Sequence, residues 1–401
     1  MKLHRIWFDP PHLRWGRVLW TVAIATALLA LWLAQRRGLF DEPPPQHAAP
    51  PASPVASVVA MASRRAASAP IAAPAVAKAS APAAAASSVE IVCGLGEVSF
   101  DPNDQKQAER AAREALDKLE AHRQRVLPGW LEEMKSSTDE QVQAGAWFLE
   151  TQREWVQRFE AGKGSAPLES LDELARLAER SRDPLPYALA FQACEMFRDR
   201  VAAPACAALR VESWAERDPS NAFVWISAAG QQGLDPARRS QYVERALAAE
   251  SMRGNWGAMH RVLAKAAPPS EAPLDRSVRF FEGAAADAFV GELQVVNAHC
   301  GDAALRQGER RQQCERLAAF LADKGDSVLS ITVGTGIGRR LGWSEDRLAR
   351  YQREREALTD LLPPEIASSG CDGLARAEAY FADVAKYGEL GALRRRRQAA
   401  R

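Results

Sequence analysis

The sequence lacks the short motifs that mark common catalytic and cofactor sites. It has no G-x-S-x-G, S-x-x-K or H-E-x-x-H pattern, so the usual serine hydrolases and zinc proteases are not indicated. It also has no C-x-x-C pair, which leaves a thioredoxin-type redox centre, a four-cysteine zinc site and a haem attachment without support. No catalytic, cofactor-binding or metal-ligating residue is therefore predicted, and no cofactor is expected.

The chain also lacks an excess of charge of either sign. It carries 52 basic and 51 acidic residues among 401, for a formal net charge of +1. The strong positive field of nucleic-acid-binding proteins is missing, so nucleic acid is not expected as a partner. Acidic pairs such as Glu132-Glu133 and Asp172-Glu173 are residues that a hydrolase uses as general acid and base, but they are also typical of solvated helix faces.

No stretch alternates apolar and polar residues as a half-buried strand would, and helical spacing is found instead. Ala112, Leu116 and Val126 share one face of a helix that starts after Asp104. The sequence Ser137–Glu140 fits a capping box ahead of a second helix. The expected fold is all-α, with further helices at residues 167–180, 184–198, 203–217, 221–231, 236–250, 254–266, 273–298, 302–323, 327–340 and 344–361.

One long apolar run, Val18–Ala34, is the single segment that can cross a bilayer. At about 1.5 Å per residue it reaches about 25 Å, the short end of what the hydrocarbon core requires. Candidate signal-peptidase sites lie inside the run, and Trp32 is a poor residue near a cut, so an uncleaved anchor is favoured over a cleaved signal peptide. Basic residues are denser before the run than after it, which predicts a cytoplasmic N-terminus.

These features divide the chain into five parts. We expect a cytoplasmic tail at 1–17, a transmembrane helix at 18–35, an extended linker rich in Ala and Pro at 36–88, a helical domain at 89–390 and a basic tail at 391–401. The abundance of Ala and Arg indicates a GC-rich bacterial genome, which would place the domain in the periplasm. The predicted location is therefore the inner membrane, with one span and most of the chain in the periplasm.

All six cysteines lie beyond the apolar run, where an even number in an exported domain indicates disulfides. Six cysteines allow fifteen pairings. Cys194 and Cys206, and likewise Cys300 and Cys314, flank turns between predicted helices, so each pair is expected to bridge a helical hairpin. Cys93 and Cys371 then join the two ends of the domain; closing so long a loop contributes about 5 kcal/mol in the chain-entropy model.

A shift of about 34 residues aligns parts of the segment 186–266 with one another, including Phe191 with Trp225 and Leu209 with Val243. This period and the pairs of short helices resemble a degenerate tetratricopeptide or Sel1-like repeat. The resemblance covers about two repeats and implies a solenoid-like protein-interaction surface. The matching residues are Phe191, Trp225 and Tyr242, and either packing in the core or contact with a ligand would explain them.

Three further features have two interpretations each. The glycines of Gly334–Gly338 could form a phosphate loop, but the apolar context favours a buried helix whose glycines admit a close neighbour. His260 and His299 lie near helix ends, where satisfied polar groups are commoner than ligands. The basic cluster Arg394–Arg397, together with Arg401, is either a solvated chain end or a contact for anionic lipid or another acidic surface.

Anchor, spacer and short paired helices favour a membrane-anchored periplasmic module for protein interaction or scaffolding, without catalytic chemistry of its own. The expected partners are the inner membrane and a protein of the cell envelope. The alternative is a cell-envelope enzyme, such as a peptidoglycan hydrolase, whose acidic residues are assembled only in the fold. A deep cleft with two carboxylates of raised pKa would favour the enzyme, and a shallow helical face would favour the module.

Overall fold

A computed structural model describes residues 88–100, 104–161, 167–198, 200–201, 203–231, 233–287, 296, 299–359 and 370–399. The predicted span Val18–Ala34 lies outside these residues, and so does the predicted linker except for its last residue, Ser88. Within the described ranges, no helix is both long and apolar enough to cross a bilayer.

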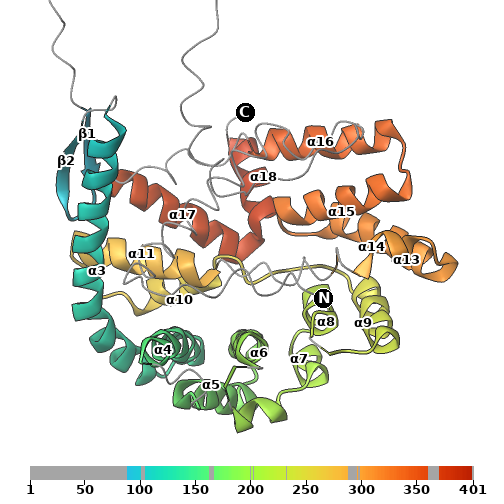
Figure 1. The fold of residues 1–401 in the computed structure, drawn as a ribbon, viewed down its shortest axis with the longest axis horizontal. Helices are drawn as coiled ribbons and strands as arrows, with labels where there is room; N and C mark the ends of the chain where they lie inside the picture. The colour runs from blue at the N-terminus through green and yellow to red at the C-terminus, as the bar shows by residue number, and fades with distance from the viewer. Residues whose placement is uncertain are drawn as a thin grey trace, which may run out of the picture. The chain divides into compact units, whose positions relative to one another are not determined.

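The all-α fold class is confirmed for the described residues, which form helices and one short strand pair (Figure 1). The helices are α3 (Gln105–Lys135), α4 (Glu140–Glu160), α5 (Glu169–Arg180), α6 (Pro184–Phe197), the 3-10 helix η1 (Pro204–Ala208), α7 (Val211–Arg217), α8 (Ala222–Ala229), α9 (Pro236–Ala248), α10 (Ala258–Ala266), α11 (Pro273–Asp287), α13 (Asp302–Leu305), α14 (Gly308–Lys324), α15 (Val328–Leu341), α16 (Glu345–Thr359), α17 (Cys371–Tyr387) and α18 (Glu389–Ala399).

Aspartates begin several of these helices. The carboxylates of Asp104, Asp139, Asp183 and Asp235 each accept backbone N–H groups of the first turn, which leaves fewer unpaired donors there. The capping box expected at Ser137–Glu140 is replaced by a cap at Asp139. The Ser137 hydroxyl instead accepts the N–H of Asp139, at 3.1 Å. In these four helices an aspartate thus fixes where the helix begins.

Consecutive helices pack in pairs around one continuous apolar core, as α3 with α4, α8 with α9 and α14 with α15. Two contacts join segments distant in sequence. α10 packs against both α4 and α17, and α11 packs against both α3 and α17, so the middle of the chain lies between its two ends (Figure 1). Since α9 also contacts α14, the succession of helix contacts returns to its start, unlike that of an open solenoid.

A two-stranded antiparallel hairpin precedes the helices, which corrects the expectation of no strands. β1 (Ser88–Val92) pairs with β2 (Gly96–Phe100) in the register Ser88 to Phe100. Gly94 in the connecting turn and Gly96 at the start of β2 both have positive φ, +81° and +85°. A side chain at Gly94 would collide with the backbone of Leu274, so α11 approaches the turn closely.

Two C-terminal helices, α17 and α18, are also absent from the sequence-based prediction. α18 begins at Glu389, so the predicted boundary at residue 391 falls inside a helix. Leu390, Ala392 and Leu393 are buried, and they hold Arg394–Arg397 on an ordered helix. This part of the basic cluster is therefore not a frayed chain end.

The six cysteine sulfurs lie in three pairs at disulfide distance, and the pairs are those expected from the spacing. Cys93 pairs with Cys371 with Cα atoms 4.5 Å apart. The Cα atoms are 5.7 Å apart in both of the other pairs, which are Cys194 with Cys206 and Cys300 with Cys314. The first pair ties the β1–β2 turn to the start of α17, across 278 residues of sequence.

The glycines of α15 act as expected of a closely packed helix. A Cβ atom at Gly334 would lie 2.7 Å from the carbonyl oxygen of Ala318 and 2.9 Å from the nitrogen of Ala322, both on α14. At Gly336 the same atom would meet nothing within 4 Å. The two helices therefore approach each other at Gly334.

This difference predicts opposite effects of two alanine substitutions. Gly334→Ala should lower the free energy of unfolding by about 1–3 kcal/mol, because α14 must move away. Gly336→Ala is the matched control and should raise it by about 0.5–1 kcal/mol, because alanine is the better helix former. Urea denaturation of the two variants checks this, and equal effects would contradict the close approach at Gly334.

Candidate functional site

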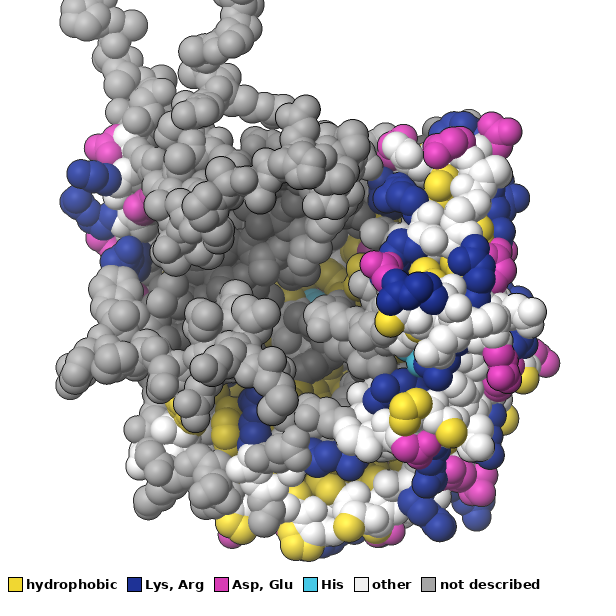
Figure 2. All heavy atoms as spheres, turned by 45° about the vertical axis from the view of Figure 1, so that its right-hand side comes forward, with side chains coloured by type: hydrophobic (Ala, Val, Ile, Leu, Met, Phe, Trp, Pro, Cys, Tyr) yellow, Lys and Arg dark blue, Asp and Glu magenta, His cyan; other side chains and the backbone are white. Residues whose placement is uncertain are grey.

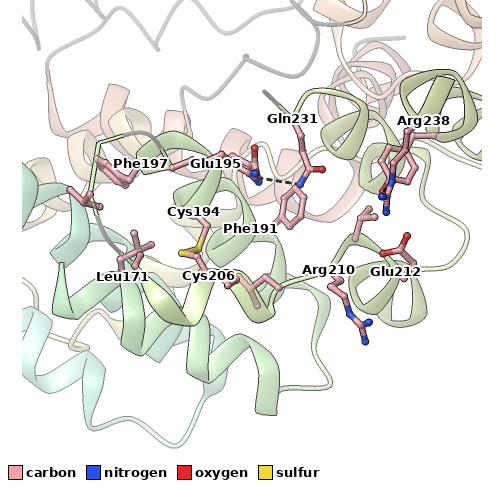
Figure 3. A pocket seen from close by; sticks show the side chains of 17 residues that line it. Leu171, Phe191, Cys194, Glu195, Phe197, Cys206, Arg210, Glu212, Gln231 and Arg238 are labelled. Carbon is pink, nitrogen blue, oxygen red and sulfur yellow. Dashed lines mark hydrogen bonds and ion pairs between the residues drawn. A yellow bond between two sulfur atoms is a disulfide. The ribbon is translucent and has the colours of Figure 1, made fainter. Parts of the chain in front are cut away.

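The strongest candidate for a binding site is a pocket of about 420 Å³ between α5, α6, η1, α7 and α9 (Figure 3). Its volume lies within the range of small-ligand and side-chain pockets. Apolar side chains line it from several elements, and charged or amide side chains join them: Leu171, Phe191, Phe197, Val201, Leu209, Val211 and Tyr242 with Glu195, Arg198, Arg210, Glu212, Gln231 and Arg238. Apart from Leu171, the lining residues belong to the segment 186–266, which carries the repeat resemblance.

Two of the three repeat-pattern residues form its apolar wall. Phe191 is 3% exposed and packs on Trp214, with ring centroids 5.2 Å apart. Tyr242 is 4% exposed and stacks on Trp225 at 5.9 Å. Trp225 does not line the pocket. The guanidinium of Arg245 lies over its ring, 4.7 Å from the ring centroid. All three residues thus pack in or against the core, and Phe191 and Tyr242 also face the pocket.

The polar part of the lining carries both signs of charge. Glu195 pairs with Arg198 and accepts a hydrogen bond from the Gln231 amide at 3.2 Å, as Figure 3 shows. Arg238 donates from Nε to the Tyr242 hydroxyl at 3.1 Å. Arg210 is exposed at the same pocket. Such a lining suits a ligand that has an apolar side chain and polar groups beside it, as a peptide segment does.

One wall of the pocket is fixed by a disulfide. The Cys194–Cys206 pair ties η1 to α6, and both cysteines line the pocket. The Asp172 carboxylate on α5 accepts the backbone N–H of Ala205 at 3.0 Å, which holds the other side of η1. The wall therefore keeps its shape without a ligand, which lowers the entropy cost of binding.

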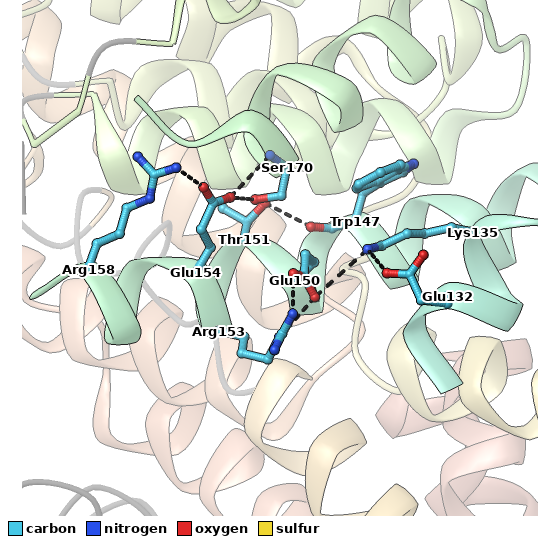
Figure 4. Close-up of polar contacts among 9 residues, drawn as sticks. All are labelled: Glu132, Lys135, Trp147, Glu150, Thr151, Arg153, Glu154, Arg158 and Ser170. Atoms are coloured by element: carbon cyan, nitrogen blue, oxygen red, sulfur yellow. Dashed lines mark hydrogen bonds and ion pairs between the residues drawn. The ribbon is translucent and has the colours of Figure 1, made fainter. Parts of the chain in front are cut away.

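The next layer of contacts fixes α5, which carries Leu171 of the pocket. No side chain of its own caps α5, and Glu154 of α4 takes that role (Figure 4). Its carboxylate accepts the N–H of Ser170 at 3.2 Å and the Ser170 hydroxyl, and it also pairs with Arg158. These hydrogen bonds to a charged carboxylate fix the start of α5 against α4, and with it the position of Leu171.

Comparison with known proteins gives no further assignment. No protein-family model, curated protein or solved structure matches the chain. The many packed helices of the structure are compatible with a helical repeat fold. The first arms of the two hairpins correspond, since Phe191 lies in α6 and Trp225 in α8. The second arms do not, because Leu209 lies between η1 and α7, whereas Val243 lies inside α9.

The two histidines are accounted for by packing and hydrogen bonds. His299 Nε2 lies 2.9 Å from the Gln313 side-chain oxygen, and burial lowers the pKa of this imidazole. His260 stacks on Phe381, with ring centroids 3.9 Å apart. Across the described residues, no group of three or more His, Cys, Asp or Glu side chains is placed to hold a metal ion.

A second group of interest, which sequence reasoning missed, is a pair of carboxyl groups at a junction of three loops. Asp326, between α14 and α15, accepts the N–H of Gly254 at 2.7 Å. Glu389, the first residue of α18, accepts the N–H of Val328 at 2.8 Å. Burial raises the pKa of Asp326 to about 6, and burial together with the Asp326 charge raises that of Glu389 to about 7.

The backbones of the loops that meet at this junction are in close contact. The N–H of Leu390 donates to the backbone oxygen of Asp326 at 2.9 Å. Gly388 has a φ of +73°, and a Cβ atom there would lie 2.9 Å from that of Asp326. The sequence shows only a glycine at this turn, which does not reveal which distant residue lies opposite.

Proposed function

We propose that the chain is a membrane-anchored module of the bacterial cell envelope, which binds a protein partner and has no catalytic chemistry of its own. The observation that carries the proposal is the pocket between α6 and α9, with its apolar wall of Phe191 and Tyr242 and its charged rim. A single apolar side chain of a partner fits this volume, and the rim groups can bind the backbone on either side of it.

The location is inferred from the sequence and from the cysteine pairs. The predicted span Val18–Ala34 would anchor the chain in the inner membrane, with its N-terminus in the cytoplasm. Three cysteine pairs at disulfide distance fit an oxidising compartment such as the periplasm. In this arrangement the linker gives the helical domain the reach to meet a partner in the envelope.

The alternative, an envelope hydrolase, is favoured by one observation, the raised pKa values of Asp326 and Glu389. Two such carboxyl groups are what acid–base catalysis requires. However, each already accepts a backbone N–H that holds a loop, Gly254 for Asp326 and Val328 for Glu389. We therefore assign both groups to the fold. Cleavage of purified peptidoglycan by the full chain, lost in Glu389→Gln, would reverse this assignment.

The binding role predicts a partner that crosslinks at the pocket and nowhere else on the domain. A photo-crosslinking amino acid at Gln231 in intact cells should capture one discrete protein, while the same residue at exposed Ala112 on α3 should not. Filling the pocket with Ala207→Trp should reduce the captured fraction about tenfold, which corresponds to about 1.4 kcal/mol of lost binding.

Thermal melting of Ala207→Trp provides the control, since Ala207 is exposed and its substitution should leave the fold intact. Capture that is equal at Gln231 and Ala112, or that is unchanged by Ala207→Trp, would rule out the pocket as the binding site. Binding of the purified partner to the purified full chain then gives the affinity directly.

A further inference from the structure

The C-terminal helices carry a cluster of basic residues that the pocket does not use. This basic cluster comprises Lys386 at the end of α17 and Arg394, Arg395, Arg396 and Arg397 on α18. Apart from Arg396, which is half-buried, its members are exposed. Because Leu390 and Leu393 anchor α18 in the core, the cluster is held rigidly at the surface. Figure 2 shows one face of the molecule, where basic side chains gather at several points among acidic ones.

Most of these cations contact tyrosine rings and not carboxylates. Lys386 Nζ and the Arg395 guanidinium lie 5.0 and 4.4 Å from the centroid of the same ring, that of Tyr387. Arg396 lies over Tyr380, at 5.2 Å. Two like charges on one ring repel each other, and a nearby anion would relieve that repulsion.

The acidic residues around the cluster do not neutralise it. Arg394 pairs with Glu354 of α16 at 2.8 Å, whereas Lys386, Arg395 and Arg397 form no ion pair with a described acidic residue. Glu389 on the same helix is occupied by the N–H of Val328. Asp383 of α17 lies on a neighbouring turn and Asp326 packs against Gly388, so the local balance of five cations and four carboxyl groups remains positive.

The fold places this cluster about one helix length from the start of the described chain. Cys371 begins α17 and is bonded to Cys93, five residues after the start of the described chain at Ser88. α17 has 17 residues and is therefore about 25 Å long, with Lys386 near its far end. In the proposed arrangement the chain that carries the cluster is anchored in the membrane, so contact between the two is an intramolecular event.

We propose that the basic cluster binds the anionic lipid headgroups of the membrane in which the chain is anchored. Each basic residue near such a surface favours contact by about fivefold, and the tether converts this weak attraction into frequent contact by keeping the two partners at high effective concentration. Tyr387, between two cations, suits the headgroup region, where one side of a side chain meets water and the other does not. This inference rests on the membrane anchoring of the proposed function.

The test uses the full chain in lipid nanodiscs with a fluorescent amino acid at exposed Gln398 on α18, or at Ala112 on α3 as a reference. Headgroup-labelled lipid that quenches the fluorophore reports close approach. Quenching at Gln398 should exceed that at Ala112 in discs containing phosphatidylglycerol. It should be weak in discs of phosphatidylcholine alone, and it should be lost at high salt.

Charge variants separate attraction from mere proximity. Arg395→Gln with Arg397→Gln should lower the contact population at least about tenfold, and Arg395→Lys with Arg397→Lys should restore it. The matched control removes two exposed arginines of α5, as Arg176→Gln with Arg180→Gln, and should have no effect. Equal quenching in the two kinds of disc, or no response to the charge variants, would overturn the inference.

Resistance of the chain to carbonate extraction from the discs is measured first, and it separates the two proposals. Integration without anionic quenching rejects the lipid contact alone. A chain that does not integrate rejects the anchor. In that case the same full chain is sedimented with phosphatidylglycerol vesicles. Binding that requires Arg395 and Arg397 would support the inference, and the absence of such binding would reject it.

Discussion

Replacing Cys93 and Cys371 by serine is expected to lower the free energy of unfolding by about 5 kcal/mol. The bond spans 278 residues, so its loss releases nearly the whole described chain in the unfolded state. It also releases the β1–β2 turn from Phe280 and Leu374, which pack against Cys93 in a separate small apolar cluster. Guanidinium denaturation under oxidising conditions measures the effect.

The matched control is the double variant Cys194→Ser with Cys206→Ser. This pair spans only 12 residues, so the same entropy argument gives a loss of about 3 kcal/mol. A loss for the long-range pair that is equal to or smaller than that for the short-range pair would contradict the argument that the longer loop gives the larger stabilisation.

The second large effect is expected from pH at the junction of Asp326 and Glu389. These two groups should contribute more to the free energy of unfolding near pH 5 than near pH 8. In the folded state their pKa values rise from 3.8 to about 6 and from 4.5 to about 7. In the unfolded chain both carboxyl groups return to their ordinary pKa values, so between about pH 4 and pH 7 the folded state binds more protons.

The sign follows from that difference in proton binding. Stability contributed by the protonated carboxyl groups is complete below about pH 4, falls as the pH rises, and is gone above about pH 7. Because the two groups interact, their effects do not add, and a loss on the order of 3 kcal/mol is expected for the pair. The positive charge of Arg253 opposes the rise in the pKa of Asp326. Near Glu389, the Glu389 charge raises the pKa of Tyr380 and the Arg396 charge lowers it.

The double variant Asp326→Asn with Glu389→Gln tests this directly. Its amide groups are uncharged at every pH, so the difference in stability between wild type and variant should change by about 3 kcal/mol from pH 5 to pH 8. Urea denaturation at the two pH values measures it, and all other titrating groups cancel in the comparison. A difference that is the same at both pH values would show that the pair does not titrate in this range.

Local signals in the sequence predicted much of the helical structure. Helix starts at Asp104, Asp183 and Ser344 carry capping side chains close to apolar periodic residues, so the pattern itself defines the element. The Ser344 hydroxyl accepts the N–H of Arg347 at 3.4 Å, at the start of the helix predicted at 344–361. The paired cysteines could be proposed for the same reason, because short spacings across a predicted turn leave few partners.

Other elements could not be predicted because their stability comes from distant contacts. The strands of the β1–β2 hairpin have five residues each, and they are stabilised by α3 and α11 more than by their own alternation. α17 does carry Leu374, Ala377, Tyr380 and Val384 at helical spacing, but the prolines after Leu362 ended the prediction too early. The pocket combines Leu171 with Tyr242 only through tertiary packing, which no local pattern encodes.

The long-range disulfide also decides how the domain would respond to mechanical force. A pull applied between the two ends of the described chain passes from Cys93 directly to Cys371, so the 278-residue interval between them bears no tension. In the oxidised protein only the short segment before Cys93 and the segment after Cys371 can extend, the latter by about 100 Å at full length. Reduction would place the whole interval under load and add about 900 Å of extension. A single covalent bond thus shields these 278 residues from any load applied between the two ends of the described chain.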